Sequence, residues 1–224
     1  MSGEIGILIA ARDEADRLGE TLAALGRAFP GARVVVADDA STDGTAAVAR
    51  AGGAEAVSAP RRLGKGGAAT LGAERLRGAP GLSAVVLCDG DLGASAGRLA
   101  ALVEALERGE GEVAVAAFAR RVGGGFGVAL GFAGRAIRRL TGLELRAPIS
   151  GQRALTPAAF EAVLPFAHGF GMEIGMTVDA HRAGFRVVEV ELDLEHRATG
   201  RTAAGFLHRA RQLRDFARVY ASRR

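Results

Sequence analysis

The chain has 224 residues with 49% hydrophobic and 24% charged side chains, which is typical of a globular protein and excludes a disordered one. Its single cysteine, Cys88, excludes a disulfide framework and a cysteine-based zinc site. The formal charge of +4 and the pI near 10.4 favour anionic partners such as phosphates, nucleic acids or an acidic membrane surface.

Length and hydropathy limit the domain organisation. A chain of this length suits one domain, here divided into residues 1–110 and residues 111–224. No apolar run approaches the ~20 residues of a membrane span, and no basic-then-apolar leader is recognisable at the start. The single cysteine agrees with a cytoplasmic location, which is the location that we expect.

Apolar runs alternate with helical patterns along the amino-terminal half. Strands are expected at residues 5–9, 34–37, 54–59 and 85–88, each followed by a helical segment. Such alternation predicts a parallel sheet with right-handed crossovers.

The carboxyl-terminal half continues with fewer strands. A helix is expected near residues 95–108, a strand near 112–118, helices around Arg135 and from Thr156, a helix containing residues 170–175, and a half-exposed strand over 187–194. The last helix, over 203–221, has aromatic residues on one face and arginines on the other. It fits either packing on the domain or docking on an anionic membrane.

The most informative motif is the strand that ends in Asp89-Gly90-Asp91. Open α/β sheets bind their ligands at the carboxyl ends of strands, and carboxylates suit Mg²⁺ or Mn²⁺. The alternative is a polar turn that caps the next helix.

A second motif is the turn from Gly64 to Gly67, which contains Lys65, the only lysine of the chain. Bare backbone amides, a helix start and one ammonium group form a plausible phosphate cradle, although the spacing is not that of a Walker A loop. The alternative is a solvated lysine in a glycine turn.

None of the four histidines has a partner at metal-site spacing. His196 follows the last expected strand and could join Asp91 around one metal ion, with Arg197 and Arg201 facing phosphates. The alternative is a surface histidine in a basic loop.

Together these motifs resemble family-2 glycosyltransferases over nearly the whole chain. That family has a P-x-x-N-E type turn, a V-D-D-G-S-x-D-x-T strand end, a G-K-G-x-A turn and a D-x-D motif. Their counterparts here are residues 10–14, 37–45, 64–68 and 89–91. The resemblance implies a GT-A fold, which is a single Rossmann-like α/β domain with a mixed, mainly parallel sheet flanked by helices.

The resemblance also implies site residues. Those for the nucleotide-sugar are Ala11, Arg12, Glu14, Asp39, Lys65, Asp89 and Gly90. Asp91 would hold Mg²⁺ or Mn²⁺ against the diphosphate and His196 would complete the metal site. Asp91 and Glu173 are the expected catalytic residues, with Glu173 as the base if the acceptor is an alcohol.

The second half resembles two subgroups with different acceptors. Gly151, Gln152, Arg153 and the segment from Arg197 through Arg201 resemble polyprenyl-phosphate sugar transferases. Residues 170–179 and 195–197 resemble glucosyl-3-phosphoglycerate synthase. Gly93 stands where some polyprenyl-phosphate enzymes have another metal ligand, which strengthens the case for His196.

The sequence therefore predicts metal-dependent transfer of a sugar from a UDP- or GDP-sugar to a phosphate-bearing acceptor. A polyprenyl phosphate is preferred over 3-phosphoglycerate, and peripheral contact with the inner face of the membrane is expected. Alternatives are a sugar-nucleotidyltransferase and a non-catalytic nucleotide-binding protein. Nucleic acid is not an expected partner, since the chain has one tyrosine and no tryptophan. The oligomeric state is not predicted.

Overall fold

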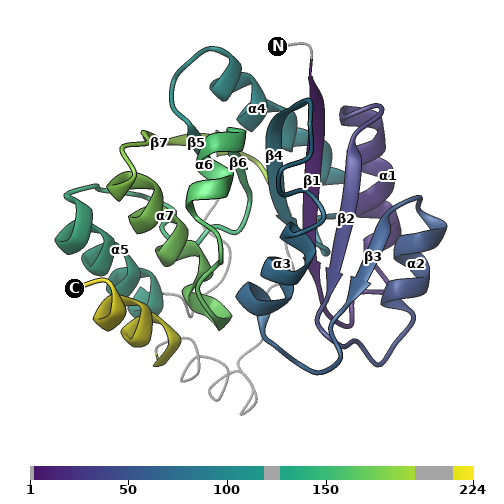
Figure 1. Cartoon of the computed structure of the whole chain (residues 1–224), viewed down its shortest axis with the longest axis horizontal. Coiled ribbons are helices and arrows are strands. Elements are labelled where there is room, and N and C mark those ends of the chain that lie inside the picture. The colour runs from purple at the N-terminus through teal and green to yellow at the C-terminus, as the bar shows by residue number, and fades with distance from the viewer. Residues whose placement is uncertain (1–2, 119–126, 195–213) are drawn as a thin grey trace.

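The computed structural model describes residues 3–118, 127–194 and 214–224 (Figure 1). Its strands are β1 (Glu4–Ala11), β2 (Arg33–Asp38), β3 (Glu55–Ser58), β4 (Leu82–Asp89), β5 (Val113–Phe118), β6 (Arg153–Leu155) and β7 (Val187–Leu192). Its α-helices are α1 (Leu18–Ala28), α2 (Thr45–Ala51), α3 (Lys65–Ala73), α4 (Ala100–Glu107), α5 (Gly127–Thr141), α6 (Pro157–Ala162) and α7 (Met172–Arg182). The 3₁₀-helices η1 (Gly93–Leu99) and η2 (Gly169–Gly171) precede α4 and α7, and residues 214–222 are helical.

The strands form one sheet in the order β3-β2-β1-β4-β6-β5-β7. β6 pairs antiparallel with β4 and β5, whereas the other pairs are parallel. The mixed, mainly parallel sheet of the predicted fold class is thus confirmed. β6 was not predicted as a strand, because its three residues include an arginine and are too few to show a period.

Helices cover both faces of the sheet (Figure 1). One core packs α1, η1 and α4 against side chains such as Ile9 and Val86, and the other packs α3, α6 and α7 against side chains such as Leu8 and Leu87. Because both faces are covered, central strands are apolar runs without alternation. Cys88 lies in this core, and burial raises the pKa of its thiol, as expected of a core residue.

A third, smaller core joins α5, α7 and the helix at 214–222. Phe216 of that helix stacks on Phe132 of α5 with ring centroids 6.4 Å apart, and Val219 is buried beside it. The apolar face of the last helix is therefore used for packing on the domain. Within the described ranges, no helix combines the length and apolarity needed to cross a membrane.

Candidate active site

The strand register brings the acidic motifs to one edge of the sheet. Ala10 of β1 pairs with Asp89 of β4, and Ala11 pairs with Asp38 of β2. The Asp38-Asp39 and Asp89-Gly90-Asp91 motifs therefore flank the end of β1, at the carboxyl edge of the parallel strands.

Polar side chains hold the turn after β1 in place. The Asp13 carboxylate accepts a hydrogen bond from the Thr42 amide at 2.8 Å, and the Asp13 amide donates to the Ser41 hydroxyl at 2.9 Å. The Ala15 amide donates to the Asp43 carboxylate at 3.1 Å. Asp13 has a φ of 53°, a conformation that aspartate tolerates better than most residues. Several acids of the motif thus have structural partners.

Three predicted nucleotide-sugar residues lie on or beside this turn. Ala11 is buried, and the Arg12 side chain donates to Asp13 at 3.3 Å. The backbone amide of Glu14 donates to the Thr45 hydroxyl at 2.9 Å. Gly90 packs closely on this turn, since a Cβ atom at Gly90 would lie 3.3 Å from Ala11 and 3.5 Å from Glu14.

Asp39 fixes the start of α3. Its carboxylate accepts hydrogen bonds from the amides of Leu63 at 2.6 Å and Gly64 at 3.0 Å. Gly64 has a φ of 79°, which glycine adopts without strain. This turn directs the next residue, Lys65, toward the end of β4.

Lys65 joins the two halves of the chain. Its ammonium nitrogen lies 2.7 Å from the Asp89 carboxylate and 2.8 Å from the Glu173 carboxylate, while Glu173 is only 5% exposed. Burial alone would lower the pKa of Lys65, but the two carboxylates outweigh burial and raise the pKa. Lys65 is therefore a half-buried cation between two anions rather than a solvated lysine.

The segment before β6 closes over this ion pair. The Gln152 amide nitrogen donates to the second oxygen of Asp89 at 2.8 Å, and the Ser150 hydroxyl donates to the Gln152 amide oxygen at 3.2 Å. A Cβ atom at Gly151 would overlap the Lys65 ammonium group. Gly151 and Gln152 thus border the ion pair of Lys65 and Asp89.

Arg153 points into the protein interior and is 0% exposed. It donates to the Ser150 carbonyl and to the Thr177 hydroxyl, each at 2.9 Å. Burial lowers its pKa to about 10, against the opposing influence of Glu173 and Glu189. Arg153 is thus held inside the protein close to Glu173, with one guanidinium nitrogen that has no hydrogen-bond partner, and its predicted contact with the acceptor stays a prediction.

Hard divalent cations prefer carboxylate ligands, and Asp91 offers one at the carboxyl edge of the sheet. Asp91 is half-buried just beyond β4, and both oxygens of the neighbouring Asp89 have protein partners. Among residues 3–118, 127–194 and 214–224, no three His, Cys, Asp or Glu side chains form a metal-binding group. The predicted residues His196, Arg197 and Arg201 lie outside the described residues.

Two supporting residues were not anticipated from the sequence. The Thr21 hydroxyl of α1 donates to the Gly90 carbonyl at 2.8 Å and accepts from the Gly93 amide at 2.9 Å, which braces the turn that carries Asp91. Ser150 orients Gln152 as described above. A lone threonine in an amphipathic helix and a serine before a glycine give no signal for either role.

Comparison with known proteins gives concordant results. The family model of glycosyl transferase family 2 matches residues 6–160. A crystal structure of glucosyl-3-phosphoglycerate synthase from Mycobacterium tuberculosis with Mg²⁺ and UDP has a TM-score of 0.80 and 26% identity, covering 99% of this chain and 79% of that one. Another, with Mn²⁺, UDP and phosphoglyceric acid, has a TM-score of 0.79 and 26% identity, with coverage of 99% and 78%. A third, with Mn²⁺, UDP-glucose and phosphoglyceric acid, has a TM-score of 0.76 and 25% identity, with coverage of 99% and 80%. The comparison with curated proteins found no match.

Proposed function

The chain belongs to glycosyl transferase family 2, and from this premise we propose that it transfers glucose from UDP-glucose to a small phosphorylated acid of the 3-phosphoglycerate class. The observation that carries the proposal is the similarity over 99% of the chain to a synthase structure that holds Mn²⁺, UDP-glucose and phosphoglyceric acid. The polyprenyl phosphate preferred from sequence becomes the second candidate.

On the donor side, different residues at the carboxyl edge of the sheet would contact different parts of the nucleotide-sugar. Asp39 and the turn containing Ala11, Arg12 and Glu14 would border the nucleoside, and Asp89 would contact the ribose or the metal. Lys65 lies beside Asp89 at 2.7 Å and would face the diphosphate. Asp91, with His196, would hold Mg²⁺ or Mn²⁺, which supplies positive charge to the diphosphate leaving group.

On the acceptor side, Glu173 is the catalytic candidate. A phosphorylated hydroxy acid reacts through a hydroxyl group, whose proton must be accepted during transfer. Glu173 is a buried carboxylate in the first turn of α7, and its ion pair with Lys65 holds it close to Asp89. Arg197 and Arg201 would face the acceptor phosphate, with Gly151 beside it.

The test is a product assay with purified protein, Mn²⁺ and UDP-glucose, offered either 3-phosphoglycerate or a short-chain polyprenyl phosphate. We expect a glucosylated phosphoglycerate by mass spectrometry, and none when GDP-mannose replaces UDP-glucose. Sugar transfer only to the polyprenyl phosphate, or only from GDP-mannose, would overturn the proposal.

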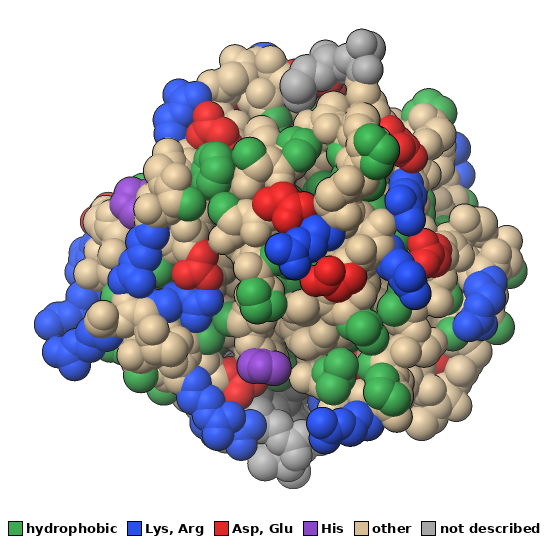
Figure 2. Space-filling model, viewed as in Figure 1, with side chains coloured by type: hydrophobic (Ala, Val, Ile, Leu, Met, Phe, Trp, Pro, Cys, Tyr) green, Lys and Arg blue, Asp and Glu red, His purple; other side chains and the backbone are tan. Residues whose placement is uncertain are grey.

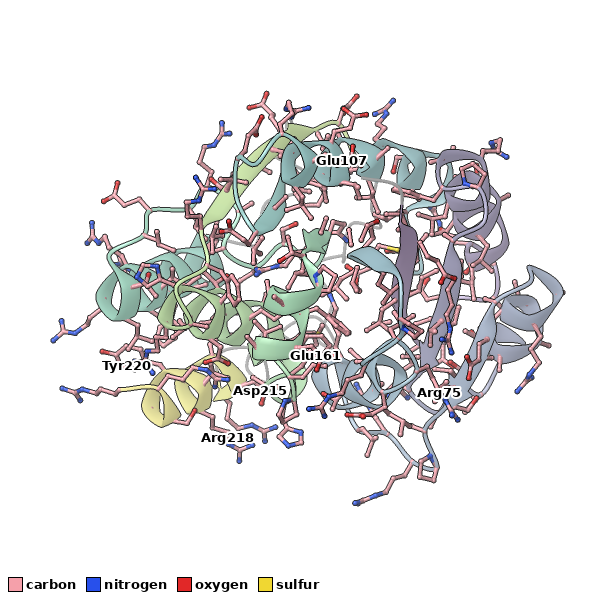
Figure 3. All side chains as sticks on the ribbon, turned by 45° about the horizontal axis from the view of Figure 1, so that its top comes forward. Arg75, Glu107, Glu161, Asp215, Arg218 and Tyr220 are labelled. Carbon is pink, nitrogen blue, oxygen red and sulfur yellow. The ribbon has the colours of Figure 1, made fainter. Side chains whose placement is uncertain are left out.

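The second candidate, a polyprenyl phosphate acceptor at a membrane, is favoured by one surface. Blue side chains gather at the left-hand edge of Figure 2, where α5, α7 and the helix at 214–222 lie, and Figure 3 shows Arg218 on that last helix. Arg135, Arg139, Arg218 and Arg224 are exposed there and form no salt bridge with a described acid. Because the apolar side of the helix is buried, attachment would be electrostatic and not by insertion.

Vesicle sedimentation tests this candidate. Binding to vesicles with anionic phosphatidylglycerol, absent with neutral phosphatidylcholine and lost at high salt, would support it. Each arginine removed should weaken binding about fivefold, since one basic residue near an anionic surface contributes roughly 1 kcal/mol. The triple variant R135Q/R139Q/R218Q is compared with R33Q/R75Q/R108Q from the other half, and equal losses would contradict a specific basic face.

A further inference from the structure

A chain of buried polar groups ends on the Asp89 carboxylate. Ser150 is 4% exposed and Gln152 is 3% exposed, and they are linked in the order Ser150 hydroxyl, Gln152 amide, Asp89 carboxylate. We propose that Gln152 is a positioning residue for donor binding, which fixes the orientation of Asp89, rather than a contact for the acceptor. The inference rests on the proposed function, because it concerns the UDP side of the same site.

The two oxygens of Asp89 have different donors. Lys65 lies 2.7 Å from one oxygen and the Gln152 amide nitrogen lies 2.8 Å from the other. A carboxylate held at both oxygens cannot rotate freely about its terminal bond, so its outward lone pairs keep one direction. Because the Asp89 side chain remains 33% exposed, it is still accessible to a ligand. Gln152 thereby fixes the orientation of the Asp89 carboxylate before the nucleotide binds.

The sheet explains why a residue 63 positions away reaches Asp89. β6 runs antiparallel to β4, and Arg153 pairs with Leu87 and with Val115 of β5. The residue before Arg153 therefore lies beside the end of β4. The carbonyl of Gln152 accepts a hydrogen bond from the Ala116 amide at 2.9 Å, so its backbone is also fixed.

The side-chain amide of Gln152 makes its hydrogen bonds to other groups of the protein. Its NH₂ group donates to Asp89 and its amide oxygen accepts from Ser150. Both groups that the side-chain amide contacts thus belong to the protein, and one of them is the carboxylate of Asp89. The resemblance assigned both Gly151 and Gln152 to the acceptor, whereas here Gly151 leaves room for Lys65 and Gln152 contacts Asp89.

The experiment compares wild type with Q152M, which keeps the length of the side chain and removes its amide. Calorimetric titrations use UDP with Mn²⁺ as the donor probe and 3-phosphoglycerate as the acceptor probe. We expect Q152M to weaken UDP binding about tenfold, as for loss of a hydrogen bond to a charged group, with 3-phosphoglycerate binding unchanged within twofold. S150A should produce a smaller loss in the same direction.

T156A is the matched control. Thr156 accepts a hydrogen bond from the Ala159 amide at the start of α6, away from Asp89. T156A should lower the melting temperature without changing UDP affinity. Weakened 3-phosphoglycerate binding with unchanged UDP binding in Q152M would overturn the proposal and assign Gln152 to the acceptor, and unchanged binding of both would also overturn it.

A double-mutant cycle separates this inference from the proposed function. Melting curves of wild type, Q152M, D89N and Q152M/D89N need no ligand. If wild type fails to bind UDP with Mn²⁺, the proposed donor is wrong. The double-mutant cycle then still tests the hydrogen bond between Gln152 and Asp89, because it needs no ligand. Coupling between the two substitutions supports positioning of Asp89 by Gln152, whereas additive effects contradict it.

Discussion

The amino-terminal and carboxyl-terminal halves of the sheet use their polar residues in different ways. In the first half, Asp13, Asp38 and Asp39 accept hydrogen bonds from backbone amides in turns. In the second half, Gln152 and Glu173 are buried and contact the side chains of Asp89 and Lys65 in the first. The first half therefore builds the site from turns at neighbouring strand ends, and the second completes it through contacts between distant segments.

The halves also differ in charge. Residues 1–118 contain 12 basic and 16 acidic side chains, whereas residues 119–224 contain 17 basic and 9 acidic ones. A divalent cation would offset the excess negative charge of the half that is proposed to hold the diphosphate, which gives a physical reason for the proposed metal at Asp91. The second half can attract an anionic acceptor without a metal.

The largest effect should come from Asp91, the proposed metal ligand of the first half. Two unit charges ~4 Å apart interact by about 4 kcal/mol at an effective dielectric constant of 20, so D91N should lower Mn²⁺-dependent UDP affinity ~10³-fold. Calorimetry with and without Mn²⁺ measures this loss. E104Q is the control, because Glu104 is an exposed partner of Arg108, and binding by D91N equal to that of E104Q would remove Asp91 from the metal site.

The next largest effect distinguishes the acceptors of the second half. If the acceptor reacts through a hydroxyl, E173Q should lower kcat ~10²-fold or more, because it removes a general base. UDP affinity should change far less. If the acceptor reacts through a phosphate oxygen, which is already ionised, kcat should stay within a few-fold. Steady-state kinetics with both acceptors measures the difference, and a uniform loss of UDP binding would contradict a role confined to the acceptor side.

The sequence predicts the strands and turns of the first half better than the contacts of the second half. The central parallel strands are recognisable because both faces are buried, and the turn acids are recognisable because their partners lie within a short motif. β6 escapes prediction since it has three residues and contains a buried arginine. The inward orientation of Arg153 and the bond from Gln152 to Asp89 depend on which strands become neighbours, which no local pattern specifies.

Substitution of Lys65 tests the ion pairs that connect the two halves, and we expect moderate losses of UDP affinity and stability. K65M leaves Asp89 and Glu173 as neighbouring anions without their shared cation. UDP affinity should fall about tenfold, and stability by roughly 2 kcal/mol, less than the ~3–5 kcal/mol of a fully buried pair because Asp89 is partly exposed. Urea unfolding and calorimetry measure the two losses. K65R, which keeps the charge, should recover part of the stability, and equal stability of K65M and wild type would show that the ion pair contributes nothing.

The smallest expected effect concerns the acid sensitivity of the turns in the first half. Hydrogen bonds from Thr42 and Thr45 hold the pKa values of Asp13 and Asp43 below the ordinary 3.8, against the opposing influence of desolvation. A carboxylate whose pKa is lower in the folded state stabilises the fold above its unfolded pKa, and this contribution is lost as the pH falls through the folded value. Wild type should therefore lose melting temperature below about pH 4. D43N should start lower at pH 7 but lose less between pH 5 and pH 3, whereas D193N, at an exposed carboxylate, should follow wild type. Parallel melting curves of wild type and D43N across this range would mean that acid sensitivity arises outside these turns.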